Sequence, residues 1–236
     1  MASAYRIPEC EAVLDGAATG HTLVEYVRRR KIDLVVASTH DHGAMGRFLS
    51  SGVARRLAHL LGARVLFVKP QVRPVLMNAH GGFNRILVAL DGSAQAEAAL
   101  QPAAALSSNQ PPVLTLVAVI SGKGETLAQR RAQAESYFEG LLPQLQHRGC
   151  RVEPVVLFAN NPATAIVRYA KEERIELIAL TTRPRGSAAR TLFGSTADAT
   201  IRKATMPGLV CHAGRTELHH AHPLPPDVAD ALLPNT

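Results

Sequence analysis

Few side chains of this 236-residue chain have the types and spacing that chemistry needs. Ser93 and Ser195 are candidate nucleophiles, but the sequence supplies no obvious histidine base for either, so nucleophilic catalysis lacks its activator. The run His40-Asp41-His42 has catalytic residue types, yet neighbours in a loop need not face each other. The three histidines within 219–222 lie in a loose terminal segment without a fixed partner for a metal. The sequence therefore predicts neither a reaction nor a native metal site.

Two other features have a simple structural interpretation. Gly194-Ser195 precede a helix-forming segment, where Ser195 would serve as the N-cap. Asp91 directly follows an apolar run, where its carboxylate would cap the next helix or its turn. Both interpretations stay open beside a binding role.

Two alternating periodicities predict the elements that position these residues. Short continuous apolar runs predict strands buried on both faces, and the longer amphipathic stretches between them predict helices. The predicted strands are 86–90, 114–120, 152–158, 175–180 and 208–212, and the predicted helices start near 93, 125, 163 and 195. This alternation predicts an open doubly wound five-stranded parallel sheet with helices on both faces.

Local signals refine these elements. Ser93, with a glutamate downstream, predicts a helix N-cap, and Pro162 fits the first turn of the third helix. Pro143 should end or kink the long helix from 125 to about 145. Pro154 removes a backbone donor from strand 152–158, which predicts an edge position for that strand.

The chain also repeats itself. Residues 31–39 match residues 174–182 at a fixed offset of 143, which suits a duplicated domain rather than a solenoid. The first copy supplies only the last two helix–strand units: helix 23–30, strand 33–37, helix 52–61 and strand 64–68. The same offset sets Met1 opposite Gln144, so we expect the first copy to lack its front half. The predicted organisation is a half-domain at 1–70, a linker at 71–83, a complete domain at 84–213 and a flexible tail at 214–236.

Composition and charge narrow the function classes. No stretch approaches 18 uninterrupted apolar residues and no export signal begins the chain, so we expect no membrane partner. Three widely spaced cysteines fit a reducing cytoplasm rather than a disulfide framework. The net charge of +7 is scattered, and its one dense run, 28–31, ends a helix, where cations meet the negative end of the dipole. We therefore expect no nucleic-acid partner.

A family resemblance rests on the order of four motifs. They are Leu90-Asp91-Gly92-Ser93, Asn161-Pro162, the run 33–40 and Gly194-Ser195. With these motifs the chain resembles the universal stress protein family over most of residues 16–213. The resemblance implies an adenine nucleotide alpha hydrolase-like fold, with ATP as a cofactor, and Mg²⁺ with it, at the carboxyl edge of the sheet.

The same resemblance implies specific contacts. Asp91 corresponds to the family's acidic residue near the nucleotide, and Val119 to the residue that packs on the adenine. Gly194 and Ser195 occupy the closing pair of the family's nucleotide pattern. Its two leading glycines are replaced by Thr181 and Pro184, which removes close backbone approach to the phosphates. We hypothesise that Arg183, Arg185 and Arg190 replace the lost donors.

These inferences together predict a cytoplasmic, tandem-type stress-response regulator that binds ATP and is not an enzyme. The alternative is a dimerisation or protein-interaction module without nucleotide; weak ATP cleavage is a third possibility, for which the sequence shows no positioned base. Because the resemblance implies association through the last strand of the sheet, we expect strand 65–68 to pair with 208–211 in an internal pseudo-dimer. Exposed strand edges also predict a homodimer.

Overall fold

The computed structural model describes residues 19–38, 64–69, 82–108, 111–122, 124–147, 149–182 and 195–212. The predicted helix 52–61, most of the linker and the whole tail lie outside these residues. In chain order the described elements are α1 (Thr19–Arg30), β1 (Leu34–Ser38), β2 (Arg64–Val68), β3 (Ile86–Leu90), α4 (Ala94–Glu97), α5 (Leu100–Ala105), β4 (Val113–Ile120), α6 (Glu125–His147), β5 (Arg151–Phe158), α7 (Pro162–Glu172), β6 (Leu177–Thr182), α8 (Ser195–Lys203) and β7 (Gly208–His212).

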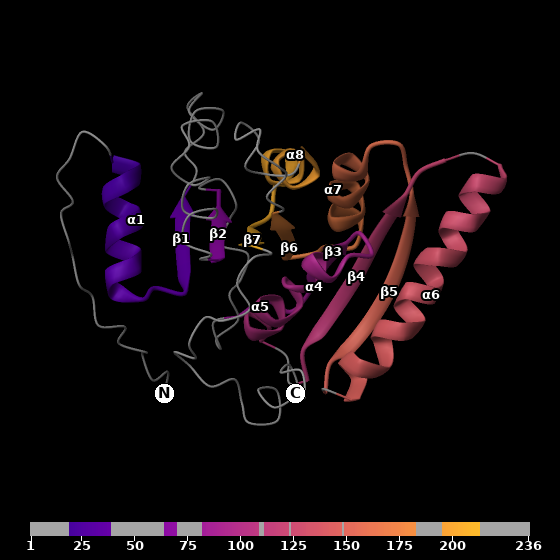
Figure 1. The fold of residues 1–236 in the computed structure, drawn as a ribbon, viewed down its shortest axis with the longest axis horizontal. Helices are drawn as coiled ribbons and strands as arrows, with labels where there is room; N and C mark the ends of the chain where they lie inside the picture. The colour runs from indigo at the N-terminus through magenta and orange to yellow at the C-terminus, as the bar shows by residue number, and fades with distance from the viewer. Residues whose placement is uncertain are drawn as a thin grey trace.

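The described strands form one sheet in the order β1-β2-β7-β6-β3-β4-β5 (Figure 1). All neighbours run parallel except β2 and β7, which are antiparallel. The five strands from β7 to β5 are the predicted open parallel sheet, and β5 lies at its edge as Pro154 predicted. The switch in strand order falls between β6 and β3, because the five-stranded part starts at β3, adds β4 and β5 on one side, and then adds β6 and β7 on the other side.

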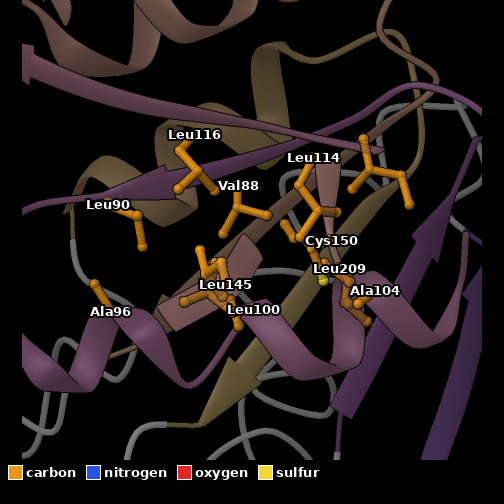
Figure 2. Packing of buried hydrophobic residues seen from close by; sticks show 14 of the residues in the cluster. Val88, Leu90, Ala96, Leu100, Ala104, Leu114, Leu116, Leu145, Cys150 and Leu209 are labelled. Carbon is orange, nitrogen blue, oxygen red and sulfur yellow. The ribbon is translucent and has the colours of Figure 1, made fainter. Parts of the chain in front are cut away.

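Helices cover both faces of the sheet, which explains the continuous apolar runs. On β3, Leu87 packs in the cluster that includes residues of α1, α7 and α8, while Val88 packs with residues of α5 and α6. Neither Leu87 nor Val88 exposes any surface. Figure 2 shows the second cluster, to which Leu114 and Leu116 of β4 and Leu145 of α6 belong. A strand buried on both faces cannot alternate apolar and polar residues.

Most predicted helix signals are confirmed and two are corrected. The Ser93 side chain accepts a hydrogen bond from the Ala96 N–H at 3.2 Å, as an N-cap does. The helix that begins there is divided into the short α4 and α5 rather than continuous. Pro143 does not end α6, which continues to His147. Leu141 and Leu145, on either side of it, are buried, so their packing holds the helix onto the sheet past the proline.

The repeat is visible in the backbone of both copies. Lys31 and Arg174, which are related by the offset of 143, share a left-handed conformation with φ of 52°. The next residue of each copy donates its N–H back into the preceding helix, from Ile32 to Val27 O at 3.1 Å and from Ile175 to Ala170 O at 2.8 Å. Both helices therefore end in the same Schellman-type cap. This cap occupies Ile175, so β6 begins at Leu177 instead of the predicted 175.

Strand pairing repeats too. Val35 pairs with Val65 and Ile178 with Gly208, which are the same positions in the two copies. The predicted pairing of the last strands is confirmed: β2 and β7 are antiparallel, with Leu66 opposite its own counterpart Leu209. This seam is therefore symmetric under the repeat, as expected of an internal pseudo-dimer.

A side-chain contact adds to the seam. Lys69, just after β2, donates from Nζ to Arg202 O at 3.0 Å and also to Ala204 O, near the end of α8. These carbonyls lie where a helix leaves its acceptors unpaired and where a cation is favourable. The first copy thus caps a helix of the second.

The residues just before β3 pack against the complete copy. Phe83 is buried and exchanges backbone hydrogen bonds of 2.9 Å with Leu106 and Ser108. A Cβ on Gly82 would lie 2.8 Å from Ser108 N, so the close approach requires glycine there. The domain boundaries proposed from the sequence remain a prediction.

Candidate functional site

A pocket of about 480 Å³ opens at the carboxyl ends of β3 and β4. Leu90, Asp91 and Gly92 line it from β3, and residues 118–121 line it from β4. The helix α6 forms the remaining wall with residues that include Arg130 and Tyr137. Parallel strands bring their carboxyl ends to one edge of a sheet, and open α/β folds bind ligands at that edge.

Asp91 has a structural role at this edge. Its Oδ1 accepts hydrogen bonds from Ser93 N at 3.2 Å and from Ser93 Oγ at 2.5 Å, while Gly92 between them takes a φ of +79°. The carboxylate therefore shapes the turn that leads into α4, as the structural interpretation predicted. Asp91 is also exposed and lines the pocket, so one residue serves the turn and faces the cavity.

Val119 lies where the resemblance implied, next to the end of β4. It lines the pocket and is partly buried, with Leu157 of β5 as its strand partner. Its side chain packs against the cluster on the α7 and α8 face of the sheet, whereas Ala118 and Ile120 beside it pack on the face that α6 covers. The structure thus brings Asp91 and Val119 into the same pocket.

The sequence analysis missed the wall that α6 contributes. Arg130 and Tyr137 are seven residues apart and lie on one face of the helix with Gln133 and Ala134. That spacing within the predicted helix was the available signal. Arg130 donates from Nη1 to the Ser121 carbonyl and lies 3.3 Å from Ser121 Oγ, which holds the guanidinium at the end of β4.

Tyr137 presents a neutral phenol to the site. Its hydroxyl donates to Glu97 Oε1 at 3.1 Å. Burial raises the pKa of Tyr137 well above its usual range, and the charge of Glu97 raises it further. The group therefore stays protonated across the physiological range and offers no base for a reaction.

The phosphate end of the predicted site is only partly described. Ser195 is the first residue of α8, so it lies inside the helix and not at the predicted N-cap position before it. It is exposed and is not among the described residues that line the pocket. Thr181 is partly buried in β6 opposite Cys211. Gly194, Pro184 and the three loop arginines lie outside the described residues.

The described residues contain buried, free thiols and no cluster of metal-ligating side chains. Nowhere among them do three or more His, Cys, Asp or Glu side chains gather as a metal site would require. Cys150 and Cys211 are free and buried, and burial raises the pKa of Cys211 to about 12, so it is no thiolate nucleophile. No helix in this part of the chain is both long and apolar enough to cross a bilayer.

Comparisons with known proteins point in one direction. The family model described as "Universal stress protein family" matches residues 82–212. A universal stress protein from Archaeoglobus fulgidus DSM 4304 is 24% identical, with a TM-score of 0.57 over 83% of this chain and 67% of that chain. A putative universal stress protein from Pseudomonas aeruginosa UCBPP-PA14 is 12% identical, with a TM-score of 0.58 over 86% of this chain and 69% of that chain. Among curated proteins, none matches this chain. At these identities the structural likeness is one of fold.

Proposed function

Because this chain belongs to the universal stress protein family, we propose that it is a cytoplasmic stress-response regulator that binds an adenine nucleotide at the carboxyl edge of its sheet. Its sheet has the adenine nucleotide alpha hydrolase-like fold that its structural neighbours share. Proteins of this family are generally not enzymes, which agrees with the prediction that the chain catalyses no reaction.

The pocket between β3, β4 and α6 is the observation that carries the proposal. Its volume of about 480 Å³ lies within the range of roughly 300–1,000 Å³ typical of small-molecule sites. Ile120 and the ring of Tyr137 offer apolar surface to a flat base, and Asp91 and Ser121 offer polar groups at the rim. Such a combination of apolar walls and few polar groups suits a nucleoside.

This chain offers few hydrogen-bond donors for the phosphates of a nucleotide. Thr181 and Pro184 stand where backbone donors would approach them, and Ser195 at the start of α8 remains as a donor. We therefore propose that the adenosine part supplies most of the binding energy of ATP. Mg²⁺ would arrive with the phosphates.

Calorimetry of nucleotide-stripped protein with ATP and Mg²⁺ tests the proposal. We expect micromolar binding with about one site per chain, and at least tenfold weaker binding in Ile120→Trp, because the larger side chain on the α6 side fills the pocket. Val113→Phe, at the other end of β4, is the matched control and should bind like the parent. Absence of binding at millimolar ATP would refute the nucleotide site.

In that case the alternative, a protein-interaction module without nucleotide, would stand. The antiparallel seam between β2 and β7 favours this second function, because it shows that these strands associate through their edges. Oligomeric state rather than ligand affinity would then be the property to measure.

A further inference from the structure

Two consecutive arginines of α6, Arg130 and Arg131, are held in different ways. Arg131 pairs with Glu135 at 2.8 Å, and its guanidinium lies 5.8 Å from the centre of the Phe158 ring. Arg130 donates from Nη1 to the Ser121 carbonyl and lies 3.3 Å from Ser121 Oγ, and within the described part of the chain no carboxylate forms an ion pair with it. A guanidinium has five N–H donors, so Arg130 has donors available for a further acceptor. The charge of Arg131 is therefore compensated inside the protein, whereas that of Arg130 is not.

The uncompensated charge of Arg130 lies at the pocket between β3, β4 and α6. Of the described residues that line this pocket, Arg130 is the one that carries a positive charge. It is exposed, and it is held at Ser121, just beyond the end of β4, so it stands at the mouth of the cavity. Tyr137 is partly buried and lies seven residues further along α6, which places it about 10 Å deeper along the helix axis. The cavity thus has an aromatic ring at depth and a cation at its mouth.

This order matches the order of groups in a nucleoside monophosphate. With its base against Tyr137, such a ligand would direct its phosphate toward the mouth. Asp91 lines the pocket from the end of β3, and its carboxylate can accept hydrogen bonds from the ribose hydroxyls between base and phosphate. Ser195 does not line the pocket, so Arg130 is the cationic donor that the described cavity wall offers to the phosphate.

We propose that Arg130 binds the phosphate next to the ribose, a role that rests on the proposed nucleotide site. A guanidinium can bind a phosphate through two parallel hydrogen bonds, and the contact with Ser121 already fixes the position of this one. A single phosphate completes the contact, and Mg²⁺ is not needed for it. The pocket therefore selects adenine nucleotides that carry at least one phosphate, AMP as well as ATP, over adenosine.

Calorimetry on the full, nucleotide-stripped chain with adenosine, AMP and ATP in the absence of Mg²⁺ tests this role. We expect AMP and ATP to bind within about threefold of each other, and adenosine to bind roughly tenfold more weakly, because it lacks the charge-assisted contact. Arg130→Met keeps the apolar stem and removes the charge, so it should lower the affinity for AMP to that for adenosine and leave adenosine binding unchanged. Arg131→Met is the matched control, since it removes the neighbouring charge, and it should bind all three ligands as the parent does.

The outcomes separate this role from the nucleotide site itself. Unchanged adenosine binding by Arg130→Met would show that the variant is folded and that only the phosphate contact is lost. Equal affinities of the parent for adenosine and AMP would overturn the role of Arg130 and leave the nucleotide site in place. The same conclusion would follow if Arg130→Met weakened adenosine as much as AMP, or if both arginine variants weakened AMP equally. Binding of none of the three ligands to the parent would refute the nucleotide site, and the role of Arg130 with it.

Discussion

The two copies of the repeat have the same backbone conformation and strand register, but their side chains are buried to different extents. The unit α1–β1–β2 has the same helix cap and the same strand register as α7–β6–β7. Leu34 is nevertheless only partly buried, while its counterpart Leu177 exposes no surface. Around Leu177, β3 pairs beside β6 and α4 contacts β6, whereas no described strand pairs beside β1. Local sequence thus determines the helix cap and the strand register, whereas the neighbouring elements determine how far each side chain is buried and how much it stabilises the fold.

Truncating the same leucine in each copy should break the comparison most clearly. We expect Leu177→Ala to lower the free energy of unfolding by about 3 kcal/mol, because it removes a fully buried side chain and leaves a cavity. Leu34→Ala should cost about 1 kcal/mol, since part of the side chain is already in water. Urea denaturation of both variants measures the difference, and equal losses would show that Leu34 is as enclosed as Leu177.

Position 208 is glycine in the second copy, while its counterpart in the first copy is Val65. The substitution Gly208→Val, which makes the two copies alike at this position, should lower the free energy of unfolding by less than Leu177→Ala does. A Cβ at Gly208 would lie 2.2 Å from Ile201 Cδ1, so Gly208→Val should cost about 2 kcal/mol through overpacking. Ile201→Ala alone is the control, and the double variant should lose less than the sum of the two single variants. Strictly additive losses in the same urea assay would place the clash elsewhere.

A third difference between the two copies concerns pH. Cys211 stands where the first copy has Val68, and burial raises the pKa of its thiol from the ordinary 9.0 to about 12. Its neutral form therefore contributes stability fully below pH 9, and this contribution is lost as the pH rises toward 12, by at most about 1.4 kcal/mol per pH unit.

Cys211→Val should flatten this loss without abolishing it, because Tyr137 also has a raised pKa and is left in place. The free energy of unfolding of parent and variant, measured at pH 8 and pH 10.5, gives the comparison. Parallel pH profiles would mean that the thiol ionises equally in the folded and unfolded chains.

Sequence reasoning predicted the fold well where a signal was local. The apolar run 86–90 and the strand 208–212 have the predicted bounds, and the Ser93 cap is present. An end of the helix at Pro143 is wrong, because packing on the sheet outweighs the lost hydrogen bond, while a kink there stays a prediction.

The candidate site was predictable only in part. Asp91 follows the end of β3 and Val119 is the next-to-last residue of β4, positions that a sequence pattern can locate, and both are among the residues that line one pocket. Arg130 and Tyr137 reach that pocket only because α6 packs over β4, a relation between distant segments that no short motif encodes. Their binding roles remain predictions.

The β2–β7 seam also has a consequence in time. Val65 and its counterpart Gly208 are 143 residues apart in the chain, so during synthesis β2 leaves the ribosome long before β7 exists. At translation rates of 5–20 residues per second, this interval is roughly 7–30 s. During this interval the apolar edge of Val65–Phe67 stays unpaired, because its partner strand has not been synthesised. An unpaired edge makes the nascent chain vulnerable to aggregation, and it is a defined segment that chaperones can protect.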